Sequence, residues 1–260
     1  MSENVQAAQT PEKSSAVGEV VEVVKTIVYA LLIALVLRVL LFQPYTIPSA
    51  SMEPNLYQGD YIIVSKYSYG YSRHSIPFSP PLFSGRVLER PPHRGDIVVF
   101  KLPRDGHTDY VKRVIGLPGD RVQMKGGLLY LNGKQVPRTF VGTTREDSGY
   151  GFIRDIAVYK ETLPGGRSFL TNDFGSDGEL DNTDVFVVPE GNYFMMGDNR
   201  DNSSDSRVPP EAGGVGYVPA ENLVGKAQII LLSWNPGASL FKPWTWVLDA
   251  RPSRFLHVLQ

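Results

Sequence analysis

Apolar residues run almost unbroken through one segment near the N-terminus of this 260-residue chain. Between Thr26 and Phe42, only Thr26 and Arg38 are not apolar. About 17 to 25 apolar residues are enough for a helix to span a bilayer, and the long stem of Arg38 can carry its charge to the interface. The pattern predicts a membrane-spanning helix, because a helix in a soluble core would show one polar face.

The small residues beyond this segment, Ser49, Ala50 and Ser51, leave open a second interpretation, which is a cleaved signal peptide. A signal peptide has a basic start, a short apolar core and small residues at the cut. Here residues 1–25 carry four glutamates against two lysines, and the apolar run is long. The sequence therefore favours a retained anchor, although its acidic start gives little support for either orientation.

After the anchor the pattern changes to short β-rich runs separated by turn signals. Six runs occur, at residues 59–71, 94–103, 109–136, 157–172, 184–198 and 225–234. Asn132-Gly133 inside the third run is a strong hairpin signal. Pro164-Gly165-Gly166 predicts a second hairpin inside the fourth run.

Helical periodicity is almost missing outside the anchor, and the 25 glycines and 20 prolines agree with many turns and short strands. The fold class we predict is mainly β. We expect a membrane-tethered domain of antiparallel sheets with a partly closed barrel, plus one N-terminal transmembrane helix. Residues 1 to about 20 are polar and small, which is typical of a disordered tail. The proline-rich stretch 74–95 and the acidic stretch 172–184 are typical of surface loops.

Composition excludes several kinds of chemistry. The chain has no cysteine, so disulfides, zinc–thiolate sites and a cysteine nucleophile are excluded. Its net charge of -1 gives no sign of a basic face, and we expect no nucleic-acid partner. The histidines lack metal-ligand spacing, and the polar stretch after Asp198 lacks the central glycine and closing glutamate of a calcium loop. We therefore expect no metal and no other cofactor.

A serine nucleophile needs a base, and histidine is the usual one. No G-x-S-x-G motif occurs. We interpret all four histidines as scattered surface residues, namely His74, His93, His107 and His257. An S-x-x-K motif occurs once, at residues 239–242, but the prolines on both sides disfavour the helix that such a motif needs.

Lys112 is another candidate base, because it lies in the strand pattern of residues 109–116 among Val, Ile and Tyr. Desolvation lowers the pKa of a buried lysine. To act near neutral pH, the pKa of the amine must fall by roughly three units, which corresponds to about 4 kcal/mol. From the residues alone, a strand lysine that points to solvent is favoured over a buried base.

The stretch Met195–Arg207 is dense in small polar residues and directly follows an apolar strand pattern. A flexible polar loop is one interpretation of this stretch. The other is a set of donors and acceptors that braces a catalytic lysine.

Four stretches in this order resemble the boxes of type I signal peptidases, the bacterial leader peptidases. Residues 47–71 resemble the nucleophile segment, 95–100 the second box, 109–120 the lysine box and 197–207 the last box. The resemblance covers the anchor and most of the chain from Tyr45 to Ser233, and it favours the buried base over the solvent-facing lysine.

The resemblance implies a serine–lysine dyad in which Ser51 is the nucleophile and Lys112 is the general base and then the general acid. It implies that the Ser49 hydroxyl and the Ser51 backbone N–H form the oxyanion hole. By the same likeness Ser203 orients the lysine, and Asp205 and Arg207 form a supporting ion pair. Six residues match positions that line pockets for small substrate side chains: Tyr45, Ile47, Met52, Val99, Tyr110 and Val111.

The family's activity implies a membrane-bound serine endopeptidase that removes N-terminal signal peptides from secreted preproteins after Ala-x-Ala-like sites. We then expect a cytoplasmic tail over 1–24, an anchor over 25–43 and an extracytoplasmic peptidase domain over 44–260, with a family-variable insertion at about 134–190. The expected location is the bacterial inner membrane, crossed once, with the catalytic domain on the periplasmic side. The expected partners are secretory preproteins, the lipid bilayer and the secretion translocon.

Other functions remain open at this level. A self-cleaving repressor-type peptidase would need a DNA-binding module, where this chain has an anchor. A catalytically silent membrane-tethered β adaptor would tolerate alanine at Ser51 and Lys112, and a secreted protein cut near Ser51 would begin there when mature. The tail after Trp234 has no counterpart in the resemblance, and its aromatic residues fit either the bilayer interface or core packing. They are Phe241, Trp244, Trp246 and Phe255.

Overall fold

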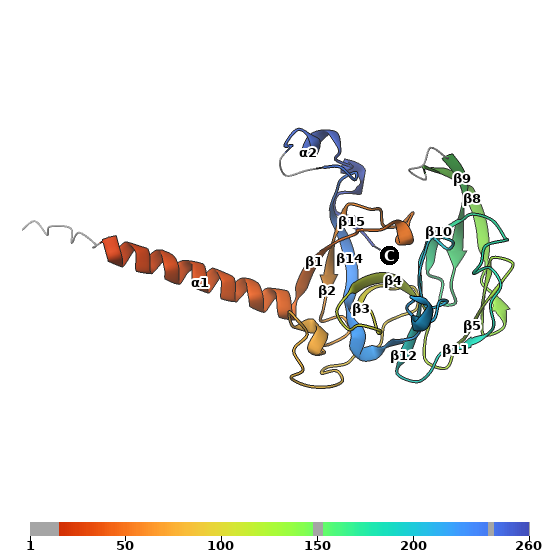
Figure 1. The fold of residues 1–260 in the computed structure, drawn as a ribbon, viewed down its shortest axis with the longest axis horizontal. Coiled ribbons are helices and arrows are strands. Elements are labelled where there is room, and N and C mark those ends of the chain that lie inside the picture. The colour runs from red at the N-terminus through yellow and green to blue at the C-terminus, as the bar shows by residue number, and fades with distance from the viewer. Residues whose placement is uncertain (1–15, 148–152, 239–241, 260) are drawn as a thin grey trace, which may run out of the picture. The chain divides into compact units, whose positions relative to one another are not determined.

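The computed structural model describes residues 16–147, 153–238 and 242–259 (Figure 1). It divides into two units, Met1–Arg38 and Val39–Gln260. Helix α1, Ala16–Leu40, contains the 24-residue stretch Val17–Leu40, which among the described residues is the one helix long and apolar enough to cross a membrane. None of its apolar window is buried in the structure, unlike a helix in a soluble core.

Helix α1 begins earlier than the sequence pattern suggested. The anchor was expected from residue 25, but the helix begins at Ala16, so residues 16–24 of the expected tail are helical. The additional turns carry Glu19 and Glu22, and Glu22 pairs with Lys25 one turn later at 2.9 Å. The disorder expected for residues 1–15 lies outside the described residues.

The second unit is built on an eight-stranded antiparallel sheet that curls into a partial barrel (Figure 1). The path is β1-β2-β14-β3-β4-β12-β13, with β15 paired to β14. Its strands are β1 Phe42–Thr46, β2 Asp60–Ser65, β3 Ile97–Lys101, β4 Asp109–Gly116, β12 Asn192–Met196, β13 Val218–Pro219, β14 Leu223–Ser233 and β15 His257–Val258. The predicted fold class, mainly β with a partly closed barrel and one N-terminal spanning helix, is confirmed.

Two smaller antiparallel sheets complete the β structure, with the orders β10-β9-β8 and β11-β5-β6-β7. Their strands are β5 Arg121–Lys125, β6 Leu128–Leu131, β7 Lys134–Gln135, β8 Arg138–Asp147, β9 Ile153–Thr162, β10 Ser168–Asp173 and β11 Phe186–Val187. Both predicted hairpins are confirmed. In the first, Asn132 and Gly133 adopt φ values of 53° and 78° between the paired residues Leu131 and Lys134, as a tight hairpin turn requires.

Helical segments in the second unit are short. They are the 3₁₀ turns η1 Ala50–Met52, η2 Arg73–Ser75, η3 Pro210–Ala212, η4 Ala220–Asn222 and η5 Pro252–Arg254, and the helix α2 Thr245–Leu248. The strands β1 and β8 and the two-residue strands β13 and β15 were not predicted. In β1 a proline interrupts five residues that directly follow the apolar anchor, so no separate strand pattern is visible.

One apolar core cluster lies directly behind the η1 turn. It contains Ile47, Met52 and Leu56 together with Ile62 and Val64 from β2 and Ile97 and Val99 from β3. Because Ile47 and Met52 flank the turn and are both buried, the serines between them are held at the surface of the main sheet.

Candidate active site

The backbone of η1 fixes the position of Ser51. Ile47 N donates to the Asp60 carbonyl at 2.8 Å, which ties the end of β1 to the start of β2. After the turn, the Glu53 and Leu56 N–H groups donate to the Ala50 and Met52 carbonyls at 3.0 and 2.9 Å. The turn is therefore bonded at both ends and packed on its inner side by Met52.

Lys112 reaches the Ser51 hydroxyl from strand β4. Its Nζ donates to Ser51 Oγ at 2.6 Å and to the Val111 carbonyl at 3.1 Å. The side chain is only 3% exposed, so the solvent-facing position favoured from the residues alone is wrong. The β3–β4 pairing, which places Lys112 opposite Val98, builds the buried position that periodicity could not reveal.

Burial lowers the pKa of Lys112 to about 8, from the ordinary lysine value of 10.5. The carboxylates of Asp205 and Asp198 oppose this shift, and the Arg207 guanidinium adds to it. The amine therefore has an appreciable neutral fraction near pH 7 to 8, which a solvent-exposed lysine lacks.

Ser49 lies at the mouth of the same turn. Its Oγ is 3.3 Å from Ser51 Oγ, within hydrogen-bond distance. Ser49 occupies the N-cap position of η1, but its side chain makes no capping bond there, so the hydroxyl is not used to hold the turn.

The segment 197–207 braces the turn from the other side. Asn199 N donates to the Ser51 carbonyl at 3.1 Å, and its Nδ2 donates to the Ala50 carbonyl at 3.2 Å. These two bonds fix the backbone on either side of the nucleophile candidate. Sequence reasoning did not single out Asn199, although it lies inside the last box.

Asp205 and Arg207 form a fully buried ion pair, with Arg207 Nε and Nη2 each 2.9 Å from a carboxylate oxygen. Burial raises the pKa of Asp205, but the Arg207 guanidinium and the N–H groups of Gly197 and Arg207 together hold it below its ordinary value. The same carboxylate accepts the Gly197 N–H at 2.9 Å, so the pair fixes the segment's backbone. The expected pairing of Asp205 with Arg207 is present.

Ser203 is buried beside the turn, and in the described structure it makes no hydrogen bond to Lys112. A Cβ placed on Gly197 would lie 2.2 Å from Ser203 Oγ and 2.5 Å from the Ser51 carbonyl oxygen, so all three groups pack closely. Ser203 Oγ has no hydrogen-bond partner among the described residues. Its expected role in orienting the lysine stays a prediction.

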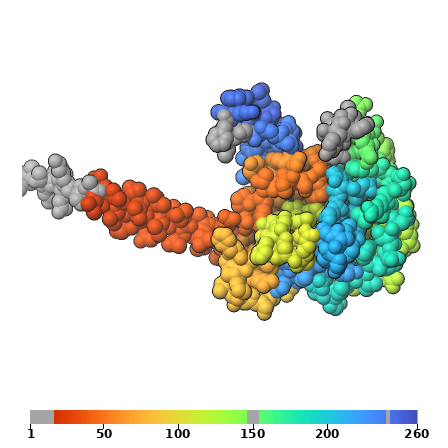
Figure 2. Space-filling view, viewed as in Figure 1, coloured from red at the N-terminus to blue at the C-terminus, as the bar shows by residue number. Residues whose placement is uncertain are grey.

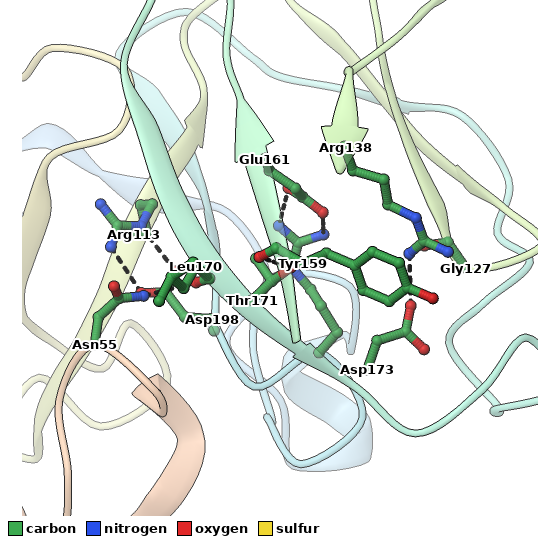
Figure 3. Close-up of polar contacts among 12 residues, drawn as sticks. Asn55, Arg113, Gly127, Arg138, Tyr159, Glu161, Leu170, Thr171, Asp173 and Asp198 are labelled. Atoms are coloured by element: carbon green, nitrogen blue, oxygen red, sulfur yellow. Dashed lines mark hydrogen bonds and ion pairs between the residues drawn. The ribbon is translucent and has the colours of Figure 1, made fainter. Parts of the chain in front are cut away.

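A second buried ion pair joins the lysine strand to the last box (Figure 3). Arg113 Nε and Nη2 each lie 2.7 Å from an Asp198 carboxylate oxygen. Asn55, four residues after Ser51, donates from Nδ2 to Asp198 at 2.8 Å and to the Leu170 carbonyl at 2.7 Å. Sequence reasoning missed these three side chains, although Arg113 stands next to Lys112 and Asp198 lies inside the last box.

A groove of about 540 Å³ opens in front of the serine–lysine pair. Five of the six residues expected to bind substrate line it, namely Tyr45, Ile47, Met52, Tyr110 and Val111. Val99 does not line it, because this side chain is fully buried in the core cluster behind the turn. The groove walls come from β1 and η1 on one side and from the first half of β4 on the other.

None of the four histidines lines this groove. His93, His107 and His257 are exposed as expected, but His74 is buried, so its surface assignment is wrong. Desolvation lowers the pKa of His74 to about 4, and its Nδ1 lies 2.9 Å from Ser79 Oγ. Ser239 of the S-x-x-K motif lies outside the described residues. Among those described, no group of three or more His, Asp or Glu side chains could hold a metal ion.

A family model and several known proteins match most of this chain. The family model described as "Signal peptidase, peptidase S26" matches residues 20–234. The chain is 47% identical over 235 residues to a Signal peptidase I of Rickettsia typhi, with 83% of this chain and 86% of the relative covered. It is 46% identical over 235 residues to that of Rickettsia prowazekii, with the same coverage. A solved signal peptidase I from Enterococcus faecalis V583 is 28% identical, covers 53% of this chain and 97% of its own, and gives a TM-score of 0.30.

Proposed function

Since this chain belongs to the signal peptidases of peptidase family S26, which remove signal peptides, we propose that it cuts secreted preproteins as a serine endopeptidase with a Ser51–Lys112 dyad. The observation that carries the proposal is the 2.6 Å contact between Lys112 Nζ and Ser51 Oγ in a site where burial depresses the lysine pKa. A nucleophilic hydroxyl within hydrogen-bond reach of a base with a lowered pKa is the arrangement that covalent catalysis requires.

In the proposed mechanism, neutral Lys112 accepts the Ser51 proton while Ser51 Oγ attacks the scissile carbonyl. The resulting oxyanion takes hydrogen bonds from the Ser49 hydroxyl and the Ser51 N–H. The Lys112 ammonium then gives its proton to the leaving amine, and an acyl-enzyme remains on Ser51. Lys112 next accepts a proton from water, whose oxygen attacks the ester, and the proton returns to Ser51 as the cleaved signal peptide leaves.

The two walls of the groove support an extended substrate. Strand β1 is the outermost strand of the sheet, so its outer edge has no neighbour in the sheet. Strand β12 pairs with β4 only from Arg113 onward, which leaves residues 109–112 of β4 paired on the β3 side alone. A strand edge without a neighbouring strand on each wall suits a β-strand-like peptide. The apolar lining suits the small side chains of an Ala-x-Ala-like site.

We also propose where this chemistry takes place. Residues 44–260 would face the extracytoplasmic side of a bacterial cytoplasmic membrane crossed once by α1, with residues 1–24 in the cytoplasm. The anchor would place Ser51, about ten residues after α1, near the depth at which a translocated signal peptide ends. Work beside the secretion translocon is part of this proposal.

The direct test incubates the detergent-solubilised full chain with a purified preprotein and sequences the new N-terminus. We expect cleavage after an Ala-x-Ala-like site. No cleavage of several preproteins, with a correctly folded protein, would instead favour a silent membrane-tethered adaptor.

We expect Ser49→Ala to lower kcat and kcat/KM by similar factors, about a hundred- to a thousandfold, with KM nearly unchanged. The reason is that the hydroxyl beside Ser51 Oγ donates only once the oxyanion develops. Ser49→Thr keeps the hydroxyl and should retain more activity than alanine. Steady-state kinetics on both variants decide this, and a wild-type kcat in Ser49→Ala would remove Ser49 from the oxyanion hole.

The pH dependence of kcat/KM should report Lys112. Only the neutral amine is a base, so activity should rise about tenfold per pH unit below the lysine pKa and level off above about 8. Initial rates between pH 6 and 10 measure the profile, with a short peptide as substrate to keep its binding constant. Simultaneous replacement of the exposed His93, His107 and His257 should leave the midpoint unchanged, whereas a midpoint that moves with them would exclude Lys112 as the titrating base.

A further inference from the structure

A surface loop carries an unusual amount of exposed apolar surface. We call residues 76–88 the apolar loop. Phe78 is 99% exposed, Leu82 71% and Leu88 72%, and from Ile76 to Gly85 there is no charged side chain. In Figure 2 the loop belongs to the amber lobe at the lower left of the β domain. Side chains this large and this exposed mark a surface that meets another apolar phase.

Few backbone N–H groups in the loop would need water as a hydrogen-bond partner. Prolines 77, 80 and 81 have no N–H group to leave unbonded. The Ile76, Ser79 and Leu82 N–H groups donate to carbonyls within or next to the loop, at 3.2, 3.1 and 2.8 Å. Unbonded backbone groups are the main obstacle to placing irregular chain in lipid, and here most donors at the tip are removed or satisfied.

The polar side chains beneath the tip also find their hydrogen-bond partners within the protein. Ser79 bonds to the neutral His74 imidazole, whose pKa burial lowers to about 4. The one charged residue of the loop, Arg86, turns inward, where its Nη1 donates to the Leu223 carbonyl at 2.7 Å and its Nη2 to the Gly70 carbonyl at 2.7 Å. Phe78 is directed outward while the polar groups near it are turned inward.

The root of the loop is bonded to the end of α1. Tyr71 pairs with Val87 in an isolated bridge that closes the loop. Tyr71 Oη also donates to the carbonyl of Leu40, the last residue of α1, at 2.8 Å, and Lys66 N donates to the Leu41 carbonyl at 2.9 Å. The root of the loop therefore lies where the apolar helix ends, which is the level at which a spanning helix leaves the hydrocarbon.

We propose that the apolar loop inserts Phe78 and Leu82 into the interfacial layer of the bilayer, as a second membrane contact beside α1. Its occupant is lipid, because the root of the loop is bonded to Leu40 at the end of the spanning helix and the tip has no charged side chain. Two fixed contacts would restrict rotation of the domain about the anchor and so hold the groove in one orientation toward the membrane.

The absence of cysteine from the chain permits a direct test. Phe78→Cys in the full chain, labelled with an environment-sensitive fluorophore, is compared in detergent-free nanodiscs of phosphatidylcholine and phosphatidylglycerol. The matched control is Phe140→Cys on β8, an exposed phenylalanine outside the loop and 57% exposed. We expect a blue-shifted emission and quenching by spin-labelled lipid at position 78 but not at position 140.

Two results would overturn the proposal. A label at position 78 that emits as in water and is not quenched by lipid would place the loop outside the bilayer. A blue shift that depends on protein concentration, without quenching by lipid, would assign the surface to a second copy of the chain. Both readouts are independent of peptidase activity, so they stand apart from the proposed function.

A second experiment measures peptidase activity in the double variant Phe78→Asp/Leu82→Asp. Cleavage of a preprotein embedded in the same nanodiscs should fall, while turnover of a short water-soluble peptide stays at the wild-type level. An equal loss on both substrates would mean that the variant damages the fold. Equal wild-type rates on both would show that the loop does not orient the enzyme at the membrane.

Discussion

Lys112→Arg should abolish preprotein cleavage, with a loss of kcat of roughly four orders of magnitude or more, as for removal of one member of other catalytic dyads and triads. Arginine keeps the positive charge and most of the length, but its guanidinium stays protonated and cannot accept the Ser51 proton. The assay is single-turnover cleavage of a preprotein, measured at pH 8 and again at pH 10. Substantial turnover by Lys112→Arg would contradict the dyad mechanism.

Ser51→Ala provides the matched variant for this experiment. It removes the nucleophile and leaves the buried Lys112 in place, so its loss should equal that of Lys112→Arg, and the double variant should lose no more than either alone. Near-ultraviolet circular dichroism of each variant separates lost chemistry from lost folding. Additive losses would mean that the two residues act independently.

Gly197→Ala should lower kcat by about a hundredfold or more, because the added methyl has no space. The new Cβ would lie 2.2 Å from Ser203 Oγ and 2.5 Å from the Ser51 carbonyl oxygen, well inside van der Waals contact. Relief requires the nucleophile turn or the segment 197–207 to move, and a displacement of about 1 Å at a reacting group can cost a hundredfold in rate. Steady-state kinetics with a short peptide measure the loss.

Gly142→Ala on β8 is the control for this substitution, since a Cβ there meets nothing within 4 Å. It should leave both kcat and the melting temperature nearly unchanged. Wild-type kcat in Gly197→Ala would show that the turn and the segment 197–207 adjust to each other without cost, and that the rigid brace is not needed.

Much of the fold could be predicted from hydrophobic periodicity and turn-forming residues. The spanning helix, both hairpins and six β-rich runs could be predicted because each depends on residues close in the chain. Strands β1 and β8 could not, and neither could the two-residue strands β13 and β15. The proline of β1 and the many threonines and charges of β8 obscure alternation, and pairing with distant partners decides those segments instead.

The candidate site also combines residues that the sequence identifies with features that depend on distant parts of the chain. The resemblance selected Ser51, Lys112 and Asp205. The burial of Lys112, however, depends not only on the preceding strand β3 but also on β12 and the segment 197–207, which lie about 80 residues or more further along the chain. Asn55 and Asn199 were missed for the same reason. An asparagine that clamps a distant backbone cannot be distinguished by composition from one in a solvated turn.

The contact between Ser51 and Lys112 joins residues 61 positions apart, and the brace behind them comes from residues still further along the chain. In an unfolded chain the lysine pKa is near 10.5, and the drop to about 8 makes its neutral fraction at pH 7 roughly 300-fold larger. On the proposed topology and mechanism, a nascent chain would therefore carry Ser51 across the membrane without a working base until residues 197–207 had also crossed and packed against the turn. The order of the segments would then keep the peptidase inactive until the whole domain has folded.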